Sequence, residues 1–174
     1  MQQSIDLLRR KLGEIYPPGE IIGFTRMIFE SLCGYTPTDI LLHTLVQKTD
    51  KYHLTAADIS LISTASALHD IGKINIPESI LNKPGRLTAE EFAVIKTHSM
   101  LGAEMLQKTE SFADQPLLQT AYEIARWHHE RWDGRGYPDG LKGDDIPISA
   151  QLVSMADVYD ALTSERCYNC LLYT

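Results

Sequence analysis

The sequence predicts an all-α fold, a helical bundle of about seven helices without a β-sheet. Every long segment repeats its apolar residues at helical spacing. No segment sustains the alternation of apolar and polar residues that marks a half-buried strand. Clusters of proline and glycine separate the periodic segments, as is typical of connections between helices.

Two helices are expected at the N-terminus. Residues 1–16 carry apolar side chains at helical intervals, and a Pro-Pro-Gly run ends that pattern. A second apolar helix is expected over residues 20–32. We interpret residues 1–37 as helices that link or dimerise the following domain, residues 38–174, so a homodimer through them is an expectation.

The next two helices lead to an adjacent histidine and aspartate. Residues 38–52 form the first of them. Thr55, followed three residues later by Asp58, resembles a capping box and predicts the start of the second. No proline or glycine interrupts the chain from there to His69 and Asp70, so we expect one rigid helix to end at this pair.

A loop is expected over residues 72–87, which contain two prolines and two glycines. Thr88 and Glu91 then form a capping box that begins the next helix. His98 follows Phe92 and Ile95 at intervals of three, which places it on the buried side of that helix.

The remaining chain predicts two more helices around a long loop. Pro116 suits a first helical turn, with Asp114 as a candidate cap, and an apolar stripe from there ends at His128. Residues 131–146 contain four glycines and read as a functional loop. The last helix is expected over residues 149–163.

Histidines and aspartates with metal-ligating chemistry recur in these segments. Adjacent residues on a helix point about 100° apart, so His69 and Asp70 can bind two metals that share a site or ligate one metal from two sides. The doublet His128-His129 suits one ligand to each of two neighbouring metals. Together the candidates would form a di- or trinuclear site with nitrogen and oxygen ligands. They are His69, Asp70, His98, His128, His129 and the carboxylates of the last helix, Asp157 and Asp160.

Such a site suits phosphodiester hydrolysis. The reaction needs a strong nucleophile and neutralisation of charge at phosphorus, and two metals can supply both. Histidine and carboxylate ligands without a thiolate suit Fe, Mn, Ni or Zn.

Composition excludes other classes of protein. The net charge of −7 argues against a binder of polymeric nucleic acid, which would need a basic face. No apolar run is long enough for a membrane span, and we see no signal peptide. Three cysteines are an odd number, so a reducing, cytoplasmic location fits best. We read the pair Cys167 and Cys170 as incidental.

Two segments resemble the signatures of a known family. Residues 69–73, HDIGK, and residues 128–138, HHERWDGRGYP, look like the two signatures of the HD-GYP family. This branch of the HD phosphohydrolases hydrolyses cyclic di-GMP in bacterial second-messenger signalling. The resemblance runs from about Thr38 to Tyr168, and the second signature is long and specific.

The resemblance implies a metal-dependent phosphodiesterase that produces the linear dinucleotide or two GMP, with two or three iron or manganese ions. Lys73 matches a lysine that touches the substrate phosphate, although a solvated helix-end cation is the plain alternative. Arg166 matches a substrate-contacting arginine, with a surface ion pair as its alternative. Gly136, Tyr137 and Pro138 match the segment tied to the shape of the substrate loop and to contacts with diguanylate cyclase (GGDEF) domains. The implied metal ligands are His69, Asp70, His98, His128, His129 and Asp157, and Asp70 and Lys73 are the implied catalytic residues.

The chain departs from the family pattern in two places. The family has a histidine on its first core helix shortly after a glutamate, whereas no histidine precedes His43 here, and Glu30 stands where that segment begins. Family members also continue with further helices, so we expect the chain to be a C-terminally truncated fragment. Both departures bear on metal loading more than on the fold.

Two alternative functions stay open at this point. One is a non-catalytic module that binds cyclic di-GMP or a cyclase partner through residues 131–146. The other is an HD hydrolase acting on another phosphoester, such as a nucleotide monophosphate, which the long glycine-rich loop disfavours.

Overall fold

The computed structural model describes residues 37–163. The helices expected at 1–16 and 20–32, together with Glu30, Arg166 and the cysteines, lie outside the described residues. The chain divides into two compact units, residues 1–48 and 49–174. Helix α3 (Pro37–Lys51) spans the boundary and confirms the helix expected at 38–52.

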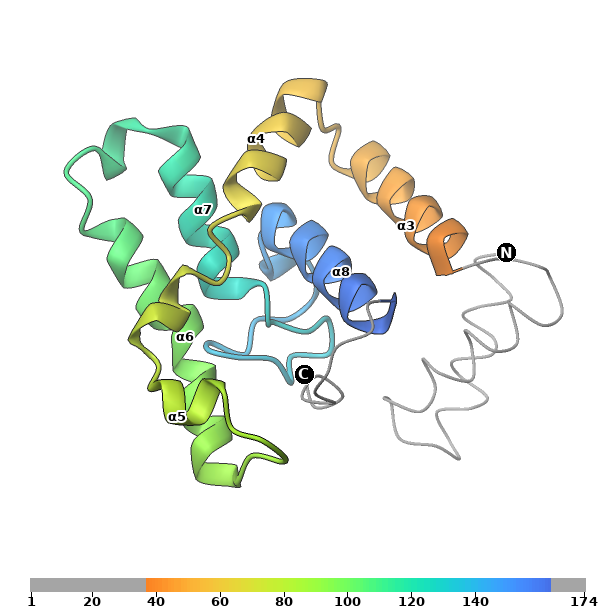
Figure 1. Cartoon of the computed structure of the whole chain (residues 1–174). Coiled ribbons are helices and arrows are strands. Elements are labelled where there is room, and N and C mark those ends of the chain that lie inside the picture. Colours follow the sequence, from red (N-terminus) through yellow and green to blue (C-terminus); the bar gives the residue numbers. More distant parts are fainter. Residues whose placement is uncertain (1–36, 164–174) are drawn as a thin grey trace, which may run out of the picture. The chain divides into compact units, whose positions relative to one another are not determined.

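The regular elements of residues 49–163 are all helices, and no β-strand occurs in the described part of the chain, so the predicted all-α class is confirmed. Figure 1 shows these helices in chain order, from α4 in yellow to α8 in blue. Three short 3₁₀ helices, η1 to η3, lie between them. The elements are α4 (Ala56–Ser66), η1 (Ile71–Asn75), α5 (Glu78–Leu81), α6 (Ala89–Gln107), η2 (Phe112–Asp114), α7 (Pro116–Trp127), η3 (Gly143–Asp145) and α8 (Ile148–Thr163).

Both predicted capping boxes are present. The Thr55 hydroxyl accepts a hydrogen bond from the backbone N–H of Asp58 at 3.2 Å, and the Asp58 carboxylate accepts one from Thr55 N at 2.8 Å. Thr88 and Glu91 make the same pair of bonds at the start of α6, at 3.2 and 2.7 Å. Each box satisfies donors that the first helical turn leaves unpaired.

Three local expectations were wrong. Helix α4 ends at Ser66 instead of reaching Asp70, because the chain then tightens into i→i+3 bonds such as His69 N to Ser66 O at 3.1 Å. The loop expected over residues 72–87 contains η1 and α5. Asp114 does not cap α7; Gln115 holds the cap position without a side-chain bond, while proline does occupy the first turn.

Helix α7 is the centre of the unit, since it packs against α4, α6 and α8. Its buried positions carry mostly small side chains, and buried positions of α4, α6 and α8 carry alanine as well. Small side chains let helix backbones approach closely, which holds the C-terminal end of α7 deep in the bundle. The fully buried residues of this core include Ala65, Ala103, Ala121, Ile124, Ala125 and Ala150.

None of the described helices combines the length and the apolar content needed to cross a membrane.

Candidate metal centre

Four of the predicted ligands come together where three helices meet. Asp70 follows α4, His98 lies in α6, and His128 and His129 follow the last turn of α7. One ligand atom of each lies within 4.8 Å of those of the others. His98 and His128 are each only 1% exposed.

A contact between two glycines brings Asp70 to His98. Helix η1 packs on α6, and a Cβ atom added to Gly72 would overlap the carbonyl oxygen of His98 and lie 2.5 Å from Gly102 N. Only glycine at position 72 permits this approach. The segment carrying Asp70 therefore lies directly on the turn of α6 that carries His98.

Backbone carbonyl groups determine which ring nitrogen of three histidines carries the proton. Nδ1 of His69 lies 2.8 Å from Ser66 O, and Nδ1 of His98 lies 2.7 Å from Ile95 O. Nδ1 of His128 lies 2.9 Å from Ile124 O. A carbonyl oxygen can only accept, so each Nδ1 donates its proton. In the neutral ring, Nε2 is then left with a lone pair for a metal.

The lone pairs of this centre face one another. Nε2 of His98 lies 3.4 Å from Nε2 of His128 and 3.3 Å from Oδ1 of Asp70. Asp70 Oδ1 is buried and accepts no hydrogen bond from the described residues. When both rings are neutral, none of these three atoms carries a proton that could form a hydrogen bond with another. A bound cation would therefore stabilise them.

The pKa values of the buried rings favour neutral imidazoles. Burial, with the nearby histidines His98 and His69, lowers the pKa of His128 to about 4. Burial, with His128 and His98, lowers the pKa of His129 to about 2. Metals bind histidine only in its deprotonated form, so both rings are ready ligands at neutral pH.

Asp70 stays ionised. Burial opposes its charge, but His69, His98 and Lys73 around it hold its pKa well below the ordinary value. Its Oδ2 atom lies 2.6 Å from Lys73 Nζ and 3.2 Å from His69 Nε2. The two oxygens of this carboxylate thus face different groups: Oδ2 meets His69 and Lys73, and Oδ1 meets His98 and His128, the latter at 3.9 Å.

These observations together test whether the residues fit a metal. The centre has an ionised carboxylate with a buried, unbonded oxygen, neutral imidazoles with converging lone pairs, and no thiolate. Such a donor set fits a divalent transition metal.

Two further predicted ligands lie at the edge of the centre, outside the set of four. The ionised Asp70 carboxylate beside it raises the pKa of His69 against the opposing effect of burial, and the charge of Asp157 raises that pKa further. The His69 ring lies edge-on to His128 with 5.2 Å between centroids. Asp157 is half-buried on α8. Lys73, the predicted substrate contact, has 42% of its side chain exposed beside Asp70.

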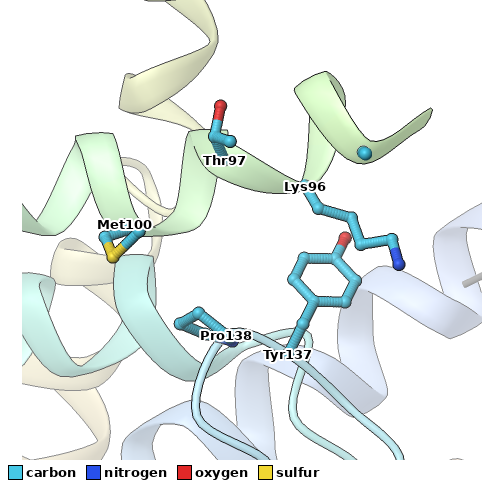
Figure 2. A pocket seen from close by; sticks show the side chains of 6 residues that line it. Lys96, Thr97, Met100, Tyr137 and Pro138 are labelled. Atoms are coloured by element: carbon cyan, nitrogen blue, oxygen red, sulfur yellow. The ribbon is translucent and has the colours of Figure 1, made fainter. Parts of the chain in front are cut away.

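The predicted substrate segment covers the side of the centre next to His129. The Tyr137 ring stacks on the His129 imidazole, with centroids 4.8 Å apart and planes at 26°. Gly136 leaves no room for a side chain, because a Cβ there would overlap Glu130 Cα and Arg131 N. The following bond, Tyr137-Pro138, is cis. In Figure 2, Tyr137 and Pro138 line a shallow pocket together with Ala93, Lys96, Thr97 and Met100 of α6.

Sequence reasoning missed one residue that builds this centre and one buried acid that lies beside it. Gly102 was not singled out as the partner of Gly72, although it falls one helical turn after His98. Glu130 directly follows the histidine doublet and is 4% exposed; its place in the HHE run was the available signal.

Comparisons with known proteins agree with this geometry. The family described as HD domain matches residues 26–171. A probable cyclic di-GMP phosphodiesterase of Vibrio cholerae is 53% identical over 124 residues, which cover 69% of this chain and 28% of that protein. A cyclic di-GMP phosphodiesterase of Thermotoga maritima is 52% identical over 110 residues, 63% of this chain and 29% of that protein.

A third relative carries another substrate in its name. The 3'3'-cGAMP-specific phosphodiesterase 2 of Vibrio cholerae is 49% identical over 117 residues, 67% of this chain and 22% of that protein. The chain thus spans less than a third of the length of these curated relatives. The family match covers most of the chain, and the chain belongs to the HD domain family.

Proposed function

We propose that this chain is a metal-dependent phosphodiesterase that hydrolyses cyclic di-GMP. The observation that carries the proposal is the convergence of Asp70, His98, His128 and His129, with ligand atoms within 4.8 Å. Two relatives, 53% identical over 69% of the chain and 52% identical over 63% of it, are named probable cyclic di-GMP phosphodiesterase and cyclic di-GMP phosphodiesterase. The products are the linear dinucleotide, GMP, or both.

The side chains of the centre divide into holding and binding roles. His69, Asp70, His98, His128, His129 and Asp157 would hold the metal. A divalent metal supplies Lewis acidity that activates water and neutralises charge at phosphorus. Lys73 offers an exposed ammonium beside the centre, where it would bind a phosphate oxygen of the substrate. Tyr137 and Pro138 would form the wall of the substrate site next to His129.

Two or three ions of iron or manganese are the proposed complement, with other divalent metals as substitutes. The opposed contacts of the two Asp70 oxygens support more than one ion, because each oxygen faces a different histidine group. The metal content of protein purified without chelator tests this number. Two or more equivalents of Fe or Mn support it, and a single equivalent contradicts it.

The activity is tested by incubating the Mn- or Fe-loaded protein with cyclic di-GMP and separating the nucleotides by chromatography. We expect the linear dinucleotide or GMP to accumulate, and His98→Ala to abolish turnover. Absence of turnover with either metal present would contradict the enzymatic proposal. Tight binding of cyclic di-GMP without turnover would then identify a binding module instead.

A second candidate substrate is 3'3'-cGAMP, because a relative at 49% identity is named for that specificity. Both molecules are cyclic purine dinucleotides, so the same metal centre suits either. Parallel assays with both substrates at equal concentration distinguish them through the ratio of kcat/KM values. A nucleotide monophosphate belongs in the same assay, and faster hydrolysis of it would contradict both cyclic substrates.

The proposed partner is a diguanylate cyclase domain, which would contact the segment Gly136-Tyr137-Pro138. This proposal, like a homodimer through residues 1–37 and a cytoplasmic location, rests on the sequence. Co-purification of the chain with an isolated cyclase domain, compared between wild type and Pro138→Ala, tests the contact. Equal retention of both proteins would contradict it.

A further inference from the structure

Glu130 is a buried acid with no role in the metal centre described above. It directly follows His129 and is 4% exposed, yet it is not among the four clustered ligands. Its Oε1 atom accepts hydrogen bonds from the backbone N–H groups of Asp139 at 2.7 Å and Gly140 at 2.9 Å. Its Oε2 atom makes no hydrogen bond to any residue that the structure describes. The carboxylate therefore serves the glycine-rich loop, residues 131–146.

The same stretch of loop is attached to α7 by a second set of bonds. The Asp139 carboxylate accepts from Arg126 at 2.8 and 3.0 Å and from Trp127 Nε1 at 2.7 Å. Planar, two-bond contact between guanidinium and carboxylate restricts geometry more than a single bond does. Asp139 is thus held through its backbone by Glu130 and through its side chain by α7.

The other end of the segment rests on the backbone of the histidine doublet. Gly136 lies against Glu130 Cα, and Tyr137 N donates to His129 O at 3.3 Å. Residues 136–140 are consequently fixed at both ends. Between these attachments, the Tyr137 ring stacks on the His129 imidazole, and Lys96 Nζ lies 5.6 Å from the centroid of the Tyr137 ring.

We propose that Glu130 is a positioning residue that holds the Tyr137 ring against His129 by accepting the N–H groups of Asp139 and Gly140. It acts on the reaction through Tyr137 and His129, and it is neither a metal ligand nor a proton carrier. The inference rests on the proposed phosphodiesterase function for its kinetic test only. This role requires an acceptor oxygen on a side chain as long as that of glutamate, and it does not require the negative charge.

Two substitutions at position 130 test the length of the side chain and its charge separately. Glu130→Gln keeps the length and the acceptor oxygen, removes the charge, and puts an amide NH2 group in place of Oε2, which makes no hydrogen bond to the described residues. Glu130→Asp keeps the charge but withdraws the carboxylate by one methylene, beyond both N–H groups. We expect Glu130→Gln to retain kcat/KM within about threefold, and Glu130→Asp to lose roughly tenfold or more, since the loop loses both of its backbone hydrogen bonds to the carboxylate. The reverse order would overturn the proposal, because a ligand or a base needs the charge.

A second readout does not depend on turnover. Trypsin cleaves after Arg135, an exposed residue of the glycine-rich loop, and a loop released from Glu130 should be cut faster. We expect faster cleavage in Glu130→Asp, an unchanged rate in Glu130→Gln, and equal Mn content in both.

The control is Asp133→Asn, an exposed acid of the same loop whose hydrogen bonds among the described residues are with Arg131 and Arg135 of that loop. This variant should keep the Mn content of the wild type, and trypsin should cleave it more slowly than Glu130→Asp. Loss of Mn from Glu130→Gln, or equal cleavage of all four proteins, would overturn the proposal. If the wild type does not hydrolyse cyclic di-GMP, the proposed function fails, while cleavage and Mn content still decide the role of Glu130.

Discussion

The backbone of Gly72 lies directly against the backbone of Gly102, and a Cβ atom added to Gly102 would be only 3.1 Å from Gly72 N. Asp70 lies two residues before the first glycine, and His98 lies one helical turn before the second. This contact between η1 and α6 therefore sets the separation of the two ligands. It joins two segments that are 30 residues apart in the sequence through direct backbone contact.

The two glycines should differ in their tolerance of alanine. We expect Gly72→Ala to lower the free energy of unfolding by roughly 3 kcal/mol, because its Cβ overlaps backbone atoms that cannot rotate away. Gly102→Ala should change it by less than about 1 kcal/mol, since better helix propensity offsets a tight contact. Urea denaturation followed by circular dichroism measures both. Equal losses in the two variants would contradict this account of the contact.

Replacing Asp70 with alanine should damage the centre more than replacing His129. The carboxylate faces two groups of histidines, whereas one imidazole serves one metal. Asp70→Ala should lose most bound metal and all measurable turnover while keeping its helicity, because the apolar core does not depend on it. Metal analysis and circular dichroism of both variants provide the comparison. If Asp70→Ala keeps its full metal content while His129→Ala loses its metal, the ligand that bridges the ions is another residue.

Lys73 should act on the substrate and leave metal content unchanged. Its ammonium contacts Asp70 Oδ2 at 2.6 Å, but 42% of the side chain is exposed, so we expect it to reach a phosphate. We expect Lys73→Met to raise KM for cyclic di-GMP by about tenfold or more, the value of one charge-assisted hydrogen bond. Lys108→Met, at the exposed residue that follows the end of α6, is the matched control. A Lys73→Met protein with unchanged KM would assign the lysine a purely structural role.

The capping box of α6 should make stability depend on pH. Hydrogen bonds from Lys83 and from the Thr88 backbone lower the pKa of Glu91 below its ordinary 4.5. A group with a depressed folded pKa stabilises the fold above its unfolded pKa, and the gain is lost as pH falls through the folded pKa. Glu91→Gln should therefore be less stable than wild type at pH near 7, and the two should converge in acid.

Urea midpoints of both proteins between neutral pH and pH near 3 test this expectation. Glu104→Gln is the control, because the Glu104 contact with Lys108 is long, at 3.9 Å, and exposed. A difference between wild type and Glu91→Gln that stayed constant through the acid range would show that the charge of Glu91 is not responsible.

Local signals in the sequence predicted the beginnings of α4 and α6, but they did not predict α5 or the residue that caps α7. Thr55 with Asp58, and Thr88 with Glu91, act within four residues, so their pattern is visible in the chain itself. The end of α4 was not predictable in this way. The switch from i→i+4 to i→i+3 bonds after Ser66 involves small energy differences, and tertiary packing decides it.

The sequence also predicted the donor atoms of the centre, but it did not predict the contacts that position them. The motif around His69 and the doublet His128-His129 indicated the donor atoms. The direction of the Glu130 side chain depends on where residues 136–140 return to α7, which no spacing along the sequence reveals. The same holds for the effect of Asp157 on His69, since α8 lies far along the chain.

Three histidines in and beside the centre, His69, His98 and His128, are oriented by the main-chain oxygens of Ser66, Ile95 and Ile124. Many metal sites use a carboxylate side chain for this purpose, and one mutation can remove it. Here no substitution at positions 66, 95 or 124 deletes the acceptor, as long as the helical turn survives. The orientation of the ligands is thus inherited from secondary structure, which lets the surrounding sequence drift while the coordinating nitrogens keep their direction.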